Sequence, residues 1–320
     1  MNLTYQKYLF TIEAKEQLIL PYYKGSTFRG AFGNAFRRVV CALRRQECAQ
    51  CMLKTSCIYS YVFETSPHVN TTIMSMHSYT RIPHPFVIEP PLESDRVYNE
   101  GDMLSFGLVL IGKTVDYLPY FVFTFDEMGK TGIGRKRGKY HLLSVTTDDG
   151  KQVYTCEDRT IHAVSHKIIN IPQDFIFSDN GHASLTITFI TPTRISFGRR
   201  LTSNPDFHIL IRSLLRRIAL LSYFHGNKQE MAWDHKRAIT VAESVSIQSN
   251  HTRWWDWERY SSKQRERMRM GGFVGEVVYE GDIRPYLPLL RAGEVFHAGK
   301  GTSFGLGKYE THSFSTLPAI

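Results

Sequence analysis

The residues best suited to hold a phosphate group lie in a glycine-rich segment near the C-terminus, HAGKGTSFGLGKYE at residues 297–310. Glycine has no Cβ, so its backbone can adopt positive φ and approach a phosphate chain closely. The segment fits neither the G-x-x-x-x-G-K-[ST] phosphate loop nor the G-x-G-x-x-G dinucleotide pattern. It therefore predicts either a turn between two elements or an anion-binding loop outside those two nucleotide motifs.

A second candidate site is a cluster of cysteines with the spacing C-x6-C-x2-C-x5-C. Its members are Cys41, Cys48, Cys51 and Cys57. Tetrahedral zinc accepts four thiolates, and a close C-x2-C pair is typical of structural zinc sites. The segment has few apolar residues, so a metal would supply folding energy that a core cannot. We expect structural zinc, with an iron–sulfur cluster or free thiols as the alternatives, and no catalytic metal because the protein fills all four positions.

The overall charge indicates an anionic partner. Lys and Arg number 39 against 30 Asp and Glu, and the pI is near 9.2. A basic protein of this kind most often binds nucleic acid, although a basic surface alone explains the balance equally well. The N-terminal residues do not resemble a signal peptide, and no apolar run approaches the roughly 20 residues that span a bilayer. We expect a soluble cytoplasmic protein with no membrane partner.

Two halves of the chain begin with the same elements. Residues 4–13 alternate as in a strand, and a helix is predicted at 27–45 with Thr27 as its N-cap. Residues 182–190 predict a second such strand, followed by a helix at 207–224. The apolar side of the first helix repeats at helical spacing and comprises Phe28, Ala31, Phe32, Ala35, Phe36, Val39, Val40 and Leu43. The basic side of the second helix comprises Arg212, Arg216 and Arg217.

The two halves also end alike. Residues 105–120 and 274–289 each contain a strand followed by G-x-x-x-x-Y-L-P, and a glycine-rich basic stretch follows each one. The shared order indicates an internal duplication. Each half is predicted to be β-α-β-β-α-β, the ferredoxin-like order. The expected fold class is therefore α+β, with one ferredoxin-like domain at 1–180 and another at 181–320. A small Cys-rich insertion at about 41–57 is expected in the first domain.

Several segments together resemble a known family. They are TFRGAFGNAFRRVVC at 27–41, GIGRKRG at 132–138, ITPTRI at 190–195, RYSSKQRERMRMGG at 259–272 and HAGKGTSFGLG at 297–307. In this combination the chain resembles the CRISPR precursor-RNA processing endoribonucleases of the RAMP (repeat-associated) superfamily. The resemblance implies binding of CRISPR repeat RNA and one metal-independent cut per repeat, made by the RNA's own 2′-hydroxyl. It implies products with a 2′,3′-cyclic phosphate and a 5′-hydroxyl.

Two other functions remain open at this stage. One is a non-catalytic scaffold subunit of the same superfamily, which would bind guide RNA beside other subunits of a CRISPR effector complex. The other is a generic RNA-binding protein with tandem RNA-recognition folds, whose central strands would carry aromatic pairs that stack on bases. The complete glycine-rich segment at 297–307 favours the processing enzyme.

The resemblance also suggests which residues do the chemistry. His297 is the first candidate for proton transfer, because histidine titrates near neutral pH, and Lys300 would offset charge in the transition state. The alternative for His297 is that it only closes the preceding helix. Members of the superfamily often carry a catalytic histidine in or after the first helix, but this helix contains none. His77 and His84 are the next candidates, and Arg29 would hold the scissile phosphate or contact a core carboxylate instead.

Glycines and cations form the predicted RNA-binding set, in which Arg and Lys on phosphates supply salt-sensitive affinity. A solvated charged surface is the alternative for the cations. The predicted RNA-binding residues are Gly299, Gly301, Gly305, Gly307, Lys308, Lys130, Arg135, Lys136, Arg137 and Arg37.

The cysteine site leads to a direct test. The purified protein should contain about one zinc per chain by elemental analysis, because four thiolates satisfy a tetrahedral ion. Cys48→Ser and Cys51→Ser should each lose most of that metal. Metal-free wild-type protein, or variants that keep the wild-type zinc content, would contradict the assignment.

Overall fold

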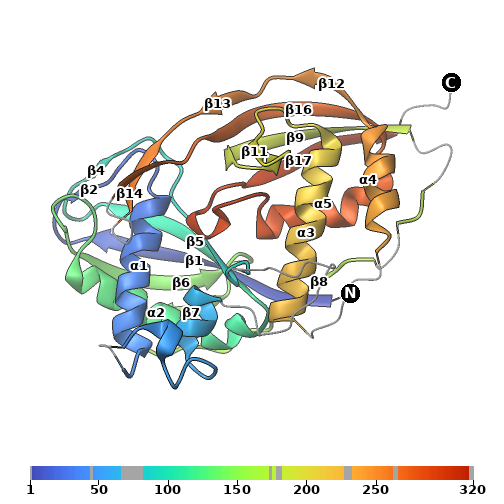
Figure 1. The fold of residues 1–320 in the computed structure, drawn as a ribbon. Coiled ribbons are helices and arrows are strands. Elements are labelled where there is room, and N and C mark those ends of the chain that lie inside the picture. Colours follow the sequence, from blue (N-terminus) through green and yellow to red (C-terminus); the bar gives the residue numbers. More distant parts are fainter. Residues whose placement is uncertain are drawn as a thin grey trace. The chain divides into compact units, whose positions relative to one another are not determined.

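The computed structural model describes residues 2–43, 46–65, 82–172, 175–177, 182–226, 233–261 and 266–316 (Figure 1). His77 lies outside these residues. The chain divides into two compact units. The N-terminal unit comprises Thr4–Ile168 and Tyr223–Lys228, and the C-terminal unit comprises Met1–Leu3, Ile169–Ser222 and Gln229–Ile320. The domain boundary predicted at residue 180 stays a prediction.

The N-terminal unit contains a mainly antiparallel sheet. Its strands in spatial order are β3 (Phe86–Glu89), β5 (Met103–Ile111), β1 (Asn2–Ala14), β6 (Tyr140–Thr147) and β7 (Gln152–Thr155), and β8 (Lys167–Asn170) also pairs with β1. The two long helices are α1 (Gly25–Val40) and α2 (Leu118–Thr131). The shorter elements are β2 (Leu18–Ile19), paired with β4 (Val97–Tyr98), and the short helices η1 (Cys48–Gln50), η2 (Ser60–Glu64) and η4 (Gly112–Tyr117).

The C-terminal unit repeats this plan. Its strands in spatial order are β12 (Ser246–Asn250), β16 (Gly272–Asp282), β9 (His182–Thr193) and β17 (Tyr309–Thr316), and β13 (Arg253–Trp255) also pairs with β16. The helices are α3 (Phe207–His225, whose end belongs to the other unit), α4 (His235–Glu243), α5 (Leu287–Phe296), η5 (Arg284–Tyr286) and η6 (Thr302–Phe304). Two ribbons complete it: β10 (Ser196–Phe197) with β11 (Arg200–Leu201), and β14 (Glu258–Ser261) with β15 (Glu266–Arg269).

Both units have the ferredoxin-like topology that the sequence predicts. In each main sheet the first strand, β1 or β9, lies between the third and fourth strands of the motif, and the second strand lies beyond the third. Antiparallel pairs such as Tyr5↔Ile111 and Val277↔Ile187 define the register. The predicted α+β class with two ferredoxin-like domains is therefore confirmed.

The core of the N-terminal unit is rich in phenylalanine. Phe10 of β1 and Phe32 of α1 are fully buried, and the rings of Phe32 and Phe125 lie 4.6 Å apart between centroids. Such pairs add about 0.5–1.5 kcal/mol beyond the burial of their area. The alternation of β1 and the helical spacing of α1 bring these apolar side chains into the same layer.

The first helix differs from its prediction at both ends. It begins at Gly25, so Thr27 lies inside the helix and is not its cap, and Lys24 occupies the cap position without a side-chain cap. The Lys24 ammonium is buried and donates to the Glu93 carbonyl at 2.6 Å. The helix ends at Val40 because Cys41 has an extended backbone. A tertiary contact thus fixes the start of the helix in place of a local cap.

One packing device occurs in both units. The Tyr140 hydroxyl donates to the Phe125 carbonyl in α2, and the Tyr309 hydroxyl donates to the Leu290 carbonyl in α5, each at 2.6 Å. A glycine in each helix, Gly129 or Gly293, makes room for that tyrosine. In each unit a buried hydrogen bond thereby links the last strand of the motif, β6 or β17, to the second helix, α2 or α5.

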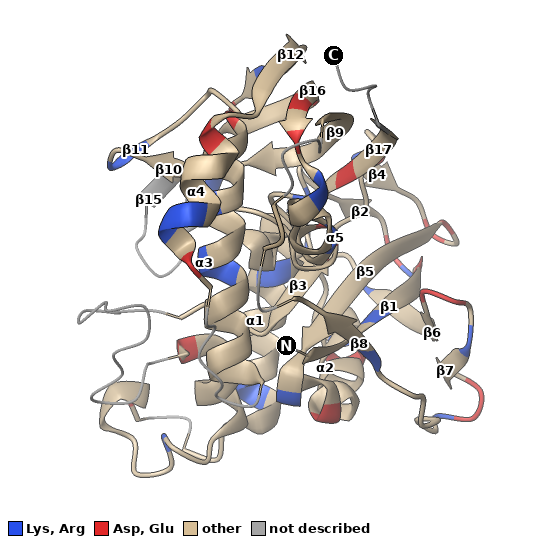
Figure 2. Ribbon diagram, turned by 90° about the vertical axis from the view of Figure 1, so that its right-hand side faces the viewer, with Lys and Arg blue, Asp and Glu red and all other residues tan. Residues whose placement is uncertain are grey.

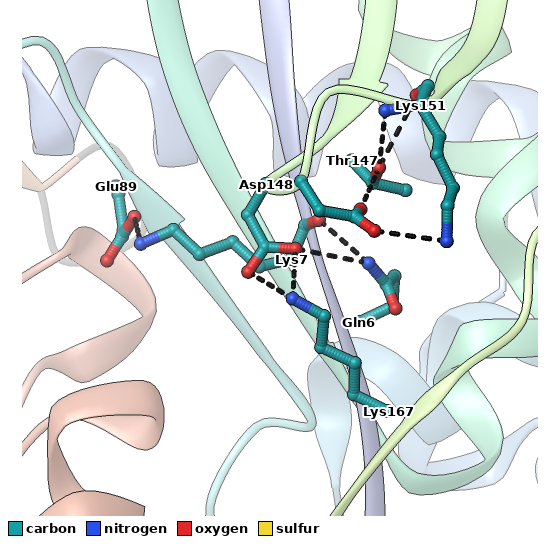
Figure 3. A network of polar contacts seen from close by, with 8 residues as sticks. Gln6, Lys7, Glu89, Thr147, Asp148, Lys151 and Lys167 are labelled. Atoms are coloured by element: carbon teal, nitrogen blue, oxygen red, sulfur yellow. Dashed lines mark hydrogen bonds and ion pairs between the residues drawn. The ribbon is translucent and has the colours of Figure 1, made fainter.

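A polar network joins four strands of the N-terminal unit (Figure 3). Lys7 in β1 pairs with Glu89 in β3 at 2.7 Å. Asp148, in the turn between β6 and β7, pairs with Lys167 in β8 at 2.7 Å, and the Gln6 amide donates to it at 3.4 Å. These lysines are neutralised within the protein.

In the described part of the chain, no helix has the length and apolar character to cross a membrane.

The Tyr309 packing generates a paired prediction. Gly293→Ala should lower the free energy of unfolding by about 1–3 kcal/mol, because the added Cβ overlaps the buried Tyr309 hydroxyl. The matched control is Gly30→Ala in α1, where a Cβ meets nothing within 4 Å. It should raise stability by roughly 0.5–1 kcal/mol. Urea denaturation of both variants measures the difference, and equal effects would contradict the packing described.

Candidate nucleic-acid interface

The glycine-rich loop, defined here as residues 297–308, joins α5 to β17. Its four glycines have positive φ, at 78° for Gly299, 79° for Gly301, 81° for Gly305 and 75° for Gly307. The loop is fastened to the end of β9 by backbone hydrogen bonds. The Lys300 N–H donates to the Arg194 carbonyl at 2.8 Å, and the Gly307 N–H donates to the Pro192 carbonyl at 3.2 Å.

A shorter loop at residues 132–139 has the same backbone pattern in the N-terminal unit. The Ile133 N–H donates to the Gly138 carbonyl, as Ala298 donates to Gly307 in the C-terminal unit. The Arg135 N–H donates to the Ile19 carbonyl at 2.9 Å, as Lys300 donates to Arg194. The two loops are therefore built alike, and η6 lengthens the second one.

His297 occupies a position that favours glycine. It caps α5 with φ 63° and ψ 162°, and the equivalent cap of α2 is Gly132 with φ 77° and ψ 155°. A non-glycine residue there costs about 1–3 kcal/mol and persists only where its surroundings hold it. The imidazole is fully buried, and its Nδ1 donates to the Leu306 carbonyl at 3.1 Å. This placement favours a structural role, and catalysis by His297 stays a prediction.

Three arginines lie around the loop. Arg194 donates to the Gly271 carbonyl at 2.6 Å, and Arg217 donates through Nε to the Phe296 carbonyl at 2.8 Å. The Arg259 guanidinium lies 4.7 Å from the centroid of the Phe304 ring. Within the described residues, none of the three forms an ion pair with a carboxylate. Asp256 acts on Arg194 only at longer range, and arginines without a close carboxylate are suited to phosphate oxygens.

Burial affects each of these cations. It lowers the pKa of all three side chains, and lowers that of Arg217 to about 9. Arg217 thus stays charged at neutral pH although only 7% of it is exposed. The prediction that it belongs to the basic outer side of its helix is wrong. Lys and Arg also occur along α3 and α4 (Figure 2), where Arg212 and Arg216 are exposed.

The predicted RNA-binding cations of the N-terminal unit have varied surroundings. Lys130 pairs with Asp126 at 2.9 Å and Glu127 at 2.7 Å, so much of its charge is neutralised. Arg37 donates to the Gln46 carbonyl at 3.3 Å, in the Cys-rich segment. The exposed predicted cations on the shorter loop are Arg135, Lys136 and Arg137. RNA contact by these residues stays a prediction.

The cations of the C-terminal loop differ in exposure. Lys300 is exposed. Lys308 is half-buried, and its N–H donates to the Thr191 hydroxyl at 2.9 Å. Their positions are compatible with phosphate contact, which stays a prediction. The sequence reasoning did not single out Arg194 or Arg259, although both lie inside motifs that carry the family resemblance.

Arg29 lies half-buried in α1 and contacts a histidine. Its terminal nitrogen NH2 is 3.3 Å from His84 Nε2, and its guanidinium lies 4.7 Å from the centroid of the Phe63 ring. His84 Nδ1 lies 3.2 Å from the Val62 carbonyl oxygen. The structure therefore brings together two of the residues considered for chemistry, Arg29 and His84. A catalytic role for His77 cannot be related to them, since it lies outside the described residues.

The four clustered cysteines are half-buried and free of disulfides. The Cys48 thiol is close enough to Cys41 and Cys57 for electrostatic interaction. Arg37 hydrogen-bonds to Cys41. Among the residues that the structure describes, no group of three or more His, Cys, Asp or Glu side chains is arranged to hold a metal ion. Zinc at this cluster stays a prediction.

Comparison with known families agrees with this architecture. Residues 3–166 match the AF_1859_N family, described as an N-terminal domain, and the chain belongs to that family because the match spans more than half of it. Residues 187–309, which include most of the second sheet and the glycine-rich loop, match the CRISPR-associated endoribonuclease Cas6 family. The C-terminal part of the chain is therefore similar in sequence to CRISPR-associated endoribonucleases.

Individual relatives of the chain are distant in sequence. An uncharacterized protein of Archaeoglobus fulgidus is 24% identical over 302 residues, covering 93% of this chain and 94% of the relative. Thermus thermophilus Cas6 in a product complex has a TM-score of 0.55 and 17% identity, over 96% of this chain and all of that one. A partial Cas6-RT-Cas1–Cas2 complex has a TM-score of 0.56 and 12% identity, over 97% of this chain and 46% of that one. At these sequence identities, the structural similarities show a shared fold.

The positive φ of His297 leads to a prediction about the relative stability of two variants. His297→Gly should be more stable than His297→Ala by roughly 1 kcal/mol, because only glycine adopts positive φ without strain. Both variants lose the ring and its hydrogen bond, so the comparison isolates the backbone. Urea denaturation measures the difference. An alanine variant at least as stable as the glycine variant would show that the position is unstrained.

Proposed function

We propose that this protein is a metal-independent endoribonuclease that binds CRISPR repeat RNA and cuts it to release guide RNAs. The observation that carries the proposal is the glycine-rich loop and three nearby arginines that form no close ion pair among the described residues, in the region that matches the Cas6 family. Positive-φ glycines let a backbone approach a phosphate chain. Arginine on phosphate supplies charge-assisted hydrogen bonds.

The reaction we propose needs no bound metal. The RNA 2′-oxygen attacks the adjacent phosphorus while the bond from phosphorus to the 5′-oxygen breaks. The products carry a 2′,3′-cyclic phosphate and a 5′-hydroxyl. The protein must hold the three atoms in line, accept the 2′-proton and stabilise charge on the phosphate oxygens, while the departing 5′-oxygen gains a proton.

RNA affinity would arise from several sources in this proposal. Arg194, Arg217 and Arg259 surround the loop, and Lys300 is exposed on it. Phosphate contacts of this kind release counterions, so binding should weaken steeply with salt. The Phe304 ring beneath Arg259 offers an aromatic face to a base. Other CRISPR effector subunits are further proposed partners, and zinc at the cysteine cluster is proposed to have a structural role.

The cleavage assay uses a synthetic RNA with one CRISPR repeat from the genome that encodes the protein. In EDTA, the wild-type protein should cut this RNA at one site and leave a cyclic phosphate. A single 2′-deoxy substitution at that site should abolish cutting but preserve binding, because only the nucleophile is lost. Gel analysis and end-group mapping measure both results. Binding without cutting would instead identify a non-catalytic scaffold.

A further inference from the structure

Several histidines of the described chain are engaged in hydrogen bonds or ion pairs within the protein. His225 is buried, with Nε2 2.8 Å from the Pro83 carbonyl and Nδ1 3.1 Å from the Tyr61 hydroxyl. His297 is buried in the glycine-rich loop. Exposed His162 pairs with Asp158 at 2.9 Å. His84 differs because it is partly exposed and bonded to a cation.

Two hydrogen bonds of His84 indicate where its proton lies. A guanidinium can only donate hydrogen bonds, so His84 Nε2 must accept from Arg29 with a lone pair. A backbone carbonyl can only accept, so Nδ1 carries the proton and donates to Val62. His84 is therefore held as a neutral imidazole with an unprotonated Nε2. This is the form that a general base requires.

The protein surroundings fix the position of both side chains. Arg29 is in the second turn of α1, and its guanidinium lies against the Phe63 ring. The His84 ring packs beside both Phe63 and Phe86, at 6.1 Å and 5.7 Å between centroids. A helix and aromatic contacts thus hold a cation beside a proton acceptor. Such rigid placement is what positioned catalysis needs.

We propose that His84 is the general base and Arg29 the phosphate ligand of the cleavage reaction. An incoming phosphate would compete with Nε2 for the Arg29 guanidinium, because a charged acceptor binds it more strongly than a neutral nitrogen. That exchange brings the scissile phosphate to Arg29 and releases Nε2 toward the neighbouring ribose. Substrate binding itself therefore prepares the base.

The step balances without a cofactor. His84 Nε2 takes the 2′-hydroxyl proton as the 2′-oxygen bonds to phosphorus, and the 5′-oxygen leaves and takes a proton from water. Arg29 stabilises the charge on the non-bridging oxygens. The imidazolium then returns its proton to solvent. This inference rests on the proposed endoribonuclease activity.

Single-turnover cleavage of the repeat RNA tests the base. His84→Ala should cut about a hundredfold or more slowly, bind RNA within a few-fold of wild type, and recover rate when imidazole is added. His84→Gln retains an amide that can donate to Val62 and accept from Arg29, so it should fold normally and still fail to cut. His162→Ala, an exposed histidine on the same unit, is the matched control and should cut normally.

A sulfur-substituted RNA separates a base from an acid. With sulfur in place of the 5′-oxygen, the leaving group needs no proton, so His84→Ala should remain slow. Restored cutting on this RNA would make His84 the acid and overturn the proposal. Arg29→Ala should also cut about a hundredfold or more slowly, with Arg29→Lys recovering part of the loss.

These experiments distinguish failure of the His84 proposal from failure of the proposed endoribonuclease activity. If wild-type protein binds repeat RNA without cutting it, the endoribonuclease activity itself is wrong. If wild type cuts and His84→Gln cuts within threefold of it, the activity stands and His84 is not the base. Loss of cutting in His84→Ala with a lowered melting temperature and no imidazole rescue would assign His84 a structural role, which also overturns the proposal.

Discussion

The hydrogen bonds that tie the glycine-rich loop to the end of β9 are the constraint on which the C-terminal site depends. Lys300 donates to the Arg194 carbonyl and Gly307 to the Pro192 carbonyl. A Cβ at Gly299 would overlap the Arg194 carbonyl, and one at Gly307 would overlap Ala298. Glycine is thus required for the loop to close against the strand, and that closure sets the loop against the backbone of Arg194.

Two features at the start of the loop cost free energy in the folded state. Arg217 holds the last carbonyl of α5 from a buried position, where a charge without a carboxylate partner is costly. His297 adds backbone strain at the next residue. The N-terminal unit builds the equivalent loop with glycine and without the additional turn. The C-terminal loop thus combines a strained backbone position with a buried charge, features that are expected where function rather than stability selects the residues.

The N-terminal unit contributes a different kind of group. Many of its cations, including Lys7, Lys130 and Lys167, are paired with carboxylates. Arg29 is held against an aromatic ring and a neutral imidazole, an arrangement that a phosphate can displace at small cost. Under the proposed function, the loop of one unit would bind the RNA backbone, and Arg29 with His84 would act on one phosphate.

Periodicity and repeated motifs in the sequence determine the fold class of each unit, because strand alternation and helical spacing specify which faces are buried. The glycine-rich loop is also recognisable in the sequence, since glycine adopts positive φ at the lowest cost. Tertiary structure alone decided that Arg217 is buried, that Lys24 starts α1, and that His84 meets Arg29 across 55 residues of chain. Local patterns do not encode such contacts, because a side chain's partner depends on how distant elements pack.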